Sequence, residues 1–271
     1  MELRLAKLTL CAAMMAGALF TSQAQAAQCG NNSSGFERWK SQFAAEAKAN
    51  GVGNRGLKAL AGTSYATKTI HADRNQKSFK YSLQKFMQIR GANSIVSVGR
   101  QKKKANAKFF ARLEAKYGVP AGPLLAIHGM ETGFGRFMGN SNVVSAIATL
   151  AYDCRRSDFF TGHLYAALQL VDRGVISSNT KGAMHGEVGH TQFLPGSVLK
   201  YGVDGDGNGR VDLAGSQYDA LASTANFLRA HGWKRGAGYQ PGQTNFRAIQ
   251  GWNAAGVYQQ AIAIMAAKID Q

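Results

Sequence analysis

The chain has 271 residues and a formal net charge of +17, from 32 basic and 15 acidic side chains. Because 45% of the residues are hydrophobic and only 17% are charged, the chain can form a packed core, which excludes a protein disordered throughout. Its polarity excludes a multi-span membrane protein. The positive charge indicates an anionic surface nearby, such as nucleic acid, lipid headgroups or a cell-wall polymer.

The chain begins with the features of a secretory signal peptide, which we predict as residues 1–27. Two basic residues precede the apolar run 8–20, which is too short to cross a bilayer, and small residues follow it. Cleavage is expected near Ala26 or Ala27, which predicts export to the periplasm. A membrane anchor is the alternative interpretation of this segment.

The cysteines support an exported protein without a lipid anchor. Cys11 follows Leu10 and Cys29 follows Gln28, whereas a lipid-attachment site requires a small residue there. We therefore expect no stable membrane anchor. After cleavage Cys29 and Cys154 remain, and two cysteines in an oxidising compartment predict one disulfide. Two unpaired thiols are the alternative.

Apolar residues at spacings of three and four predict a mainly α-helical protein, because alternation with a period of two is scarce. The expected helices cover residues 36–51, 79–87, 109–117, 124–134, 144–150, 160–174, 221–232 and 257–264. We predict a basic N-terminal helical portion over residues 28–117 and a core over residues 118–271. A glycine-rich loop region is expected over residues 177–215.

Glu131 is the strongest candidate for a catalytic group. The helical pattern places it on one face with Leu124, Ile127 and Phe134. A carboxyl group on an apolar face is partly desolvated, which raises its pKa and suits a general acid that protonates a glycosidic oxygen. The alternative is a structural glutamate that caps a helix or pairs with an arginine.

A second candidate lies in the glycine-punctuated segment Gly186–Pro195. Such a loop can bring the backbone close to a ligand. The side-chain amide of Gln192 offers both a donor and an acceptor, which suits sugar amides and hydroxyls. An ordinary polar residue near a helix start is the alternative for Gln192.

Residues 204–215 resemble an EF-hand calcium loop. Oxygen-bearing side chains stand at positions one, three and five, glycine at position six, and a backbone carbonyl is available at position seven. Position twelve is Gly215 instead of the usual glutamate, so Asp212 or Asp219 is expected to replace it. The candidate ligands of a structural Ca²⁺ are Asp204, Asp206, Asn208, Arg210, Asp212 and Asp219. A turn that binds no metal is the alternative, and no organic cofactor is expected.

In this order, these segments resemble the lytic murein transglycosylase B family. The resemblance extends over most of the chain after the signal peptide. The matching segments are Asp73-Arg74-x-Gln76, Tyr117–Pro120, Glu131–Gly135, Ala148–Leu150, Arg155-Arg156 with Phe159-Phe160, Gly189–Pro195, the 204–215 loop, Ala225–Phe227, His231–Trp233 and Trp252-Asn253-x-Ala255-x-x-Tyr258.

The resemblance implies a lysozyme-like α-helical fold with an elongated sugar groove. It also implies cleavage of the β-1,4 bond between N-acetylmuramic acid and N-acetylglucosamine without water, which leaves a 1,6-anhydromuramyl end. Glu131 would be the single acid and base. Gln192, Asn253, Tyr258 and Phe134 would contact the sugars, and residues 204–215 would bind calcium.

The chain departs from the family pattern at Glu187, because the family usually has Gly-Ala-Met-Gly where this chain has Gly186-Glu-Val-Gly189. Glu187 could be a second carboxylate in the groove, which leaves a hydrolytic muramidase possible, or a salt-bridge partner. A protein that binds peptidoglycan without cutting it is a further alternative. We expect the protein to be a monomer whose partner is the peptidoglycan strands. We expect no nucleic-acid partner.

Overall fold

The computed structural model describes residues 27–75 and 81–271, and within these ranges the protein is almost entirely helical. The predicted signal peptide lies outside them, apart from its last residue. A short 3₁₀ helix (Ser33–Gly35) precedes α1. The α-helices are α1 (Phe36–Ala49), α2 (Asn54–Ala61), α3 (Thr67–Arg74), α4 (Leu83–Ile89), α5 (Ala92–Ala105), α6 (Ala107–Tyr117), α7 (Ala121–Thr132), α8 (Val143–Tyr152), α9 (Ser157–Asp172), α10 (Pro195–Tyr201), α11 (Gln217–Ala230), α12 (Phe246–Trp252) and α13 (Gly256–Asp270).

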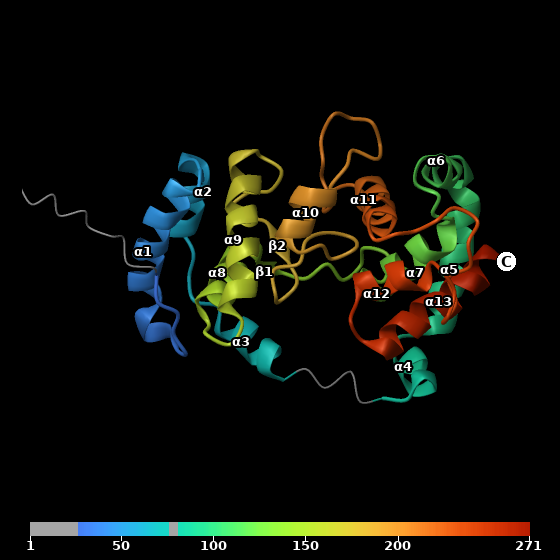
Figure 1. Cartoon of the computed structure of the whole chain (residues 1–271), viewed down its shortest axis with the longest axis horizontal. Coiled ribbons are helices and arrows are strands. Elements are labelled where there is room, and N and C mark those ends of the chain that lie inside the picture. Colours follow the sequence, from blue (N-terminus) through green and yellow to red (C-terminus); the bar gives the residue numbers. More distant parts are fainter. Residues whose placement is uncertain (1–26, 76–80) are drawn as a thin grey trace, which may run out of the picture.

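The helices are spread along the long axis of the molecule, and α8 and α9 lie back beside α2 and α3 after α4–α7 at the other end (Figure 1). Helices α1 and α2 lie at one end, and α5, α6 and α13 lie at the other. The described parts of residues 28–117 therefore contribute helices to both ends. Two short strands, β1 (Ser141–Asn142) and β2 (Lys181–Gly182), form an antiparallel pair. The mainly α-helical prediction is confirmed.

Helix α7 is the central element of the part that contains the C-terminus, because it packs against α5, α11 and α13. Two glycines allow this close approach. A Cβ atom at Gly122 would lie 2.4 Å from the carbonyl oxygen of Ala266 in α13, and one at Gly129 would lie 2.5 Å from the side chain of Ile95 in α5. Neither position has room for a side chain.

A disulfide joins the start of the described chain to the end of α8. Cys29 and Cys154 are bonded, as predicted. The bond is flanked by two backbone hydrogen bonds, from Gly30 N–H to the Tyr152 carbonyl (2.9 Å) and from Cys154 N–H to the Gly30 carbonyl (3.2 Å). The disulfide therefore fixes the N-terminal segment on the core.

The predicted loop region 177–215 is only partly confirmed, because α10 interrupts it at Pro195–Tyr201. Proline stands at the first helical position, where its fixed φ angle and missing N–H are tolerated. Among the described residues, no helix has both the length and the hydropathy needed to cross a bilayer.

Candidate active site

Glu131 is partly exposed, whereas every other residue of α7 is buried. Its carboxyl group is therefore the one polar group that this largely apolar helix leaves accessible. The helix ends at Thr132 because Gly133 adopts a left-handed conformation with φ 56°. Phe134 has φ 63° and lies beyond the helix. The prediction that Phe134 continues the helical face of Glu131 is therefore wrong; its ring instead packs against His128, with Lys102 above it.

One oxygen of Glu131 accepts two hydrogen bonds from aromatic side chains. The Tyr258 hydroxyl donates to Oε1 at 2.6 Å, and the Trp252 indole N–H donates to the same atom at 3.0 Å. No described residue bonds to Oε2, which is also absent from the buried polar atoms that lack a partner. A proton carried by Glu131 therefore belongs on Oε2, the oxygen that remains open to a ligand.

The surroundings of Glu131 raise its pKa above the ordinary value. Burial is the main cause, and the negative charge of Glu187 adds to it. The hydrogen bonds from Tyr258 and Trp252 and the positive charge of Arg90 act in the opposite direction. No ion pair joins Glu131 to a described arginine, so the alternative of a glutamate held by arginine is not supported.

The two donors to Glu131 are themselves held by packing. Tyr258, in α13, is 4% exposed and its ring faces Phe86 with a centroid separation of 5.9 Å. Trp252, at the end of α12, packs edge-to-face on Phe193 and Phe227, with centroid separations of 5.2 and 5.1 Å. This burial of Tyr258 positions its hydroxyl on the acid. Its predicted contact with sugar stays a prediction.

Gln192 lies on a tight loop whose backbone is strained. It has φ 55°, which is uncommon for a residue with a side chain, and such residues cluster at functional sites. Val188 and Phe193 exchange backbone hydrogen bonds of 2.8 and 3.0 Å across this loop. The Gln192 amide Nε2 donates to the Gly189 carbonyl at 2.7 Å, which leaves its amide oxygen for a ligand.

Two further predicted residues lie close in sequence to these groups. Asn253 directly follows Trp252, is partly exposed, and accepts a hydrogen bond from Ala255 N–H at 2.9 Å. Glu187 is partly buried beside His185, whose Nδ1 lies 3.6 Å from Oε1 of Glu187. Because this contact is an ion pair only when His185 is protonated, the salt-bridge interpretation of Glu187 stays a prediction. Its charge also raises the pKa of Glu131.

The arginines of the Arg155-Arg156 pair both contact the buried carboxylate of Asp73 in α3. Arg74 pairs with Asp153 at 2.5 Å beside them. These ion pairs connect α3 to the turn between α8 and α9. The fold thus brings together two motifs that lie far apart in the sequence, and their opposite charges pair.

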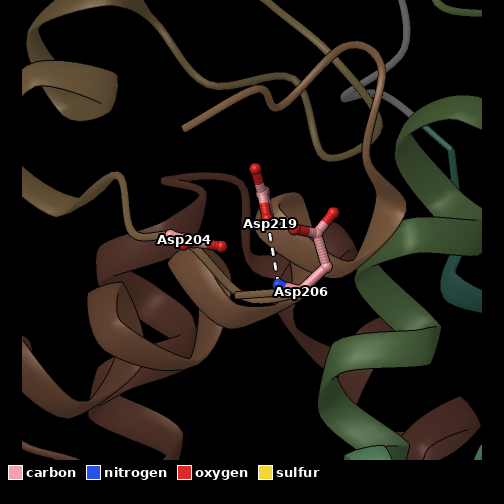
Figure 2. A group of neighbouring side chains, drawn as sticks. All are labelled: Asp204, Asp206 and Asp219. Carbon is pink, nitrogen blue, oxygen red and sulfur yellow. Dashed lines mark hydrogen bonds between the residues drawn. The ribbon is translucent and has the colours of Figure 1, made fainter. Parts of the chain in front are cut away.

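The carboxylates of the predicted calcium loop form a cluster before and within α11. Oxygen atoms of Asp204, Asp206 and Asp219 lie within 4.8 Å of one another (Figure 2). Asp219 lies in the first turn of α11, is fully buried, and accepts hydrogen bonds from the backbone N–H of Gly205 at 2.8 Å and of Asp206 at 3.3 Å. Figure 2 shows the bond from Asp206 to Asp219.

Two other predicted ligands are turned toward the loop itself. Asp212 accepts hydrogen bonds from Ala214 N–H and Gly215 N–H at 3.1 and 2.8 Å and is not part of the three-carboxylate group. The Asn208 side-chain oxygen accepts from Arg210 N–H at 2.9 Å. Of the two residues expected to replace the missing glutamate, the geometry therefore favours Asp219.

The carboxylate cluster fits a calcium ion in chemistry and size. Ca²⁺ prefers oxygen ligands at about 2.3–2.6 Å, so ligands on opposite sides of the ion are about 5 Å apart. The carboxylate oxygens of the three residues lie within 4.8 Å of one another, which agrees with this span. Backbone N–H groups, led by that of Gly209, hold the pKa of Asp204 below its usual range, which keeps this carboxylate ionised.

Comparison with known proteins identifies the family. Residues 35–241 match the model described as the transglycosylase SLT domain. The chain belongs to this family.

A relative of this chain is the membrane-bound lytic murein transglycosylase B of Escherichia coli strain K12, which is 39% identical over 122 residues. That alignment covers 44% of this chain and 34% of the relative, so it spans about a third of the length of that protein. The resemblance seen in the sequence is thus confirmed.

Two solved structures share the fold of this chain. SltB3 of Pseudomonas aeruginosa, solved in complex with NAG-anhNAM-pentapeptide, has a TM-score of 0.80 and 29% identity, over 87% of this chain and 79% of that one. Slt35 of Escherichia coli in complex with calcium has a TM-score of 0.75 and 23% identity, over 90% of this chain and 96% of that one. At this identity the second match shows the fold alone.

Several residues at the site have roles that their sequence context did not indicate. Trp252 stands in one of the motifs that resemble the family, but its bond to Glu131 joins residues 121 positions apart and depends on how α12 packs. Arg90 acts on Glu131 and lies over the Tyr258 ring at 5.8 Å. A hydrogen-bonded pair, His128 and His190, was also missed. In the sequence, a histidine inside the apolar run of α7 was the available signal.

Proposed function

We propose that the chain is a lytic transglycosylase that cleaves the β-1,4 bond between N-acetylmuramic acid and N-acetylglucosamine in peptidoglycan. The observation that carries this proposal is the carboxyl group of Glu131, which has a raised pKa, two donors on Oε1 and an open Oε2. Membership of the transglycosylase SLT domain family and the complex of SltB3 with an anhydromuropeptide support it.

The proposed reaction uses one carboxyl group twice. Oε2–H of Glu131 donates its proton to the glycosidic oxygen, and the bond from that oxygen to the anomeric carbon breaks. The resulting carboxylate is stabilised by Tyr258 and Trp252. It then accepts the proton of the muramyl 6-hydroxyl, whose oxygen bonds to the anomeric carbon. The products are a free 4-hydroxyl and a 1,6-anhydro end, and no water is consumed.

The partly exposed residues beside Glu131 suit contacts with the sugar. Gln192 presents an amide oxygen on its strained loop, and Asn253 follows the Trp252 donor. We propose both as sugar contacts, together with Phe134, whose ring lies on the segment after α7. A cavity of about 560 Å³ that is lined by Lys104, Phe109 and Tyr218, among others, does not include Glu131.

A hydrolytic muramidase is the second candidate, and Glu187 is the observation that favours it. A hydrolase requires a base that activates water, and the charge of Glu187 is close enough to affect Glu131. In the account proposed here, Glu187 instead keeps Glu131 protonated. The 6-hydroxyl is then the nucleophile in place of water. The substitution Glu187→Gln should therefore still give the anhydro product.

We further propose that residues 204–219 bind a structural Ca²⁺ through Asp204, Asp206 and Asp219. The ion would neutralise part of the charge of three close carboxylates and join the loop to α11. The disulfide supports folding in an oxidising compartment, which agrees with the proposed export to the periplasm through the signal peptide.

The substitution Glu131→Gln tests the proposed acid. Glutamine keeps the shape and an oxygen acceptor for Tyr258 and Trp252, but it has no proton to donate. We expect turnover of purified peptidoglycan to fall by about 10²–10⁴-fold with glycan binding retained, because general acid catalysis contributes about that much. Glu114→Gln, on an exposed part of α6, is the matched control and should change neither. Full activity of Glu131→Gln would remove the basis of the proposal.

A further inference from the structure

A pair of histidines links the helix of Glu131 to the loop of Gln192. His128 lies one turn before Glu131 in α7 and is 0% exposed. Its Nε2 lies 3.1 Å from Nδ1 of His190, which stands two residues before Gln192. The two rings meet edge to face at a centroid separation of 5.1 Å. The rings therefore form the direct side-chain bridge between the two segments.

The arrangement of neighbours fixes which ring is the donor. Nδ1 of His128 has no hydrogen-bond partner among the described residues. A buried N–H without an acceptor is costly, whereas a bare ring nitrogen only loses an acceptor contact. The lower-energy arrangement therefore places the proton of His128 on Nε2, which donates to Nδ1 of His190. Burial lowers the pKa of His128 to about 3, with contributions from His190 and Lys102, so the ring is neutral in this arrangement.

Other contacts show that the site is built around the His190 ring. The Thr132 hydroxyl, also in α7, donates to the His190 carbonyl at 2.7 Å and accepts from Gly135 N–H at 2.9 Å. Gly135 has φ 89°, and a Cβ atom there would lie 2.4 Å from Cε1 of His190. The backbone N–H of His190 donates to the Leu213 carbonyl at 2.9 Å. The loop is thus attached to α7 through both its backbone and its side chain.

We propose that the hydrogen bond from His128 to His190 is a positioning device that sets the Gln192 loop against Glu131. Neither ring touches the reacting atoms, so both are positioning residues. The backbone of Gln192 is strained at φ 55° and needs external support. The same loop carries Phe193, which packs on Trp252, a donor to Glu131. A displaced loop would therefore disturb both the sugar contact and the acid. This inference rests on the proposed function.

The test compares a substitution that keeps the acceptor with one that removes it. In His190→Asn the side-chain oxygen takes the place of Nδ1, whereas His190→Phe keeps a ring and leaves the His128 N–H unpaired. We expect His190→Asn to retain kcat/KM for purified peptidoglycan within about twofold. His190→Phe should lose about tenfold or more, because small displacements of positioned groups are costly. Circular dichroism and thermal unfolding check that both variants are folded.

His163→Asn is the matched control, because His163 is also partly buried and its Nδ1 accepts a backbone N–H, from Gly196, but it lies in α9. It should leave kcat/KM near the wild-type value. Nitrogen NMR of the histidine rings of the whole protein supplies a readout that does not depend on activity. We expect His128 to be protonated on Nε2 alone at neutral pH.

Equal activity of the Asn and Phe variants, or a His128 proton on Nδ1, would overturn the inference. If the wild-type protein itself does not cleave peptidoglycan, the proposed function fails, and the NMR result still decides whether the histidine bond exists. If His190→Phe is unfolded, His128→Leu, which also removes the donor, replaces it, and His128→Gln, which keeps an N–H donor, is its conservative partner.

Discussion

The hydroxyl of Tyr258 offers a quantitative test of how the site controls its acid. It donates to Oε1 of Glu131 at 2.6 Å, a short bond to a group that becomes charged during the reaction. A donor of this kind stabilises the carboxylate more than the neutral acid. The substitution Tyr258→Phe removes the hydroxyl and keeps the ring that packs on Phe86. The pKa of Glu131 should therefore rise.

The size of the shift follows from the strength of such bonds. A hydrogen bond to a charged group contributes about 1.5–3 kcal/mol, and one pKa unit corresponds to about 1.4 kcal/mol. Loss of the Tyr258 hydroxyl should raise the pKa of Glu131 by about one to two units, with the bond from Trp252 remaining. The substitution Glu187→Gln removes a negative charge that raises this pKa, so it should lower it. The two substitutions thus have opposite signs.

The assay is the pH dependence of kcat/KM for soluble peptidoglycan fragments. Because Glu131 must be protonated in the free enzyme, activity falls as pH rises through its pKa. Tyr258→Phe should move this alkaline limb to higher pH, and Glu187→Gln should move it to lower pH. Tyr239→Phe is the control, because it removes a hydroxyl that donates to Asp270 at 2.8 Å at the other end of α7. An unmoved limb, or a downward shift in Tyr258→Phe, would refute the reasoning.

Three further outcomes test other parts of the account. Removal of calcium should lower the melting temperature and its return should restore it, whereas Asp219→Asn should abolish this response in a thermal-shift titration with CaCl₂. Replacement of Cys29 and Cys154 by serine should cost about 2–5 kcal/mol in the free energy of unfolding by urea, because their bond closes a loop over a separation of 125 residues. The pKa of His128 falls from 6.5 to about 3 on folding, so the unfolded chain binds the proton first as pH drops. Between pH 6.5 and 4.5 the wild type should therefore lose about 2 kcal/mol relative to His128→Gln, and parallel urea curves for the two proteins would contradict this.

Much of the helical framework could be predicted from the sequence, because helical spacing of apolar residues reports burial directly. This apolar pattern was weaker in helices that are short or that have small side chains at their packed positions. Helix α2 contains two glycine or alanine residues at its packed positions, and α10 begins at a proline within a glycine-rich segment. Such helices are specified by the surfaces on which they pack rather than by their own periodicity. The division into residues 28–117 and 118–271 stays a prediction.

The site shows the same limit more sharply. Glu131 could be found because a carboxyl group in an apolar helix is an anomaly that one sequence reveals. The orientation of its carboxyl oxygens could not be predicted, because it depends on hydrogen bonds from Trp252 in α12 and Tyr258 in α13. Likewise the helical spacing extended to Phe134, although Gly133 ends the helix before it. The spacing of the predicted calcium loop was visible in the sequence, but the choice of Asp219 as a candidate ligand depended on the first turn of α11.

The central claim, that Glu131 works with the substrate's own 6-hydroxyl and without water, is tested most directly by the mass of the products. Purified sacculi digested with the wild-type protein and with Glu187→Gln should both yield muropeptides that end in 1,6-anhydromuramic acid. In heavy-oxygen water these ends should carry no label. Products heavier by one water, with the label at the reducing end, would show that the enzyme is a muramidase and contradict the account.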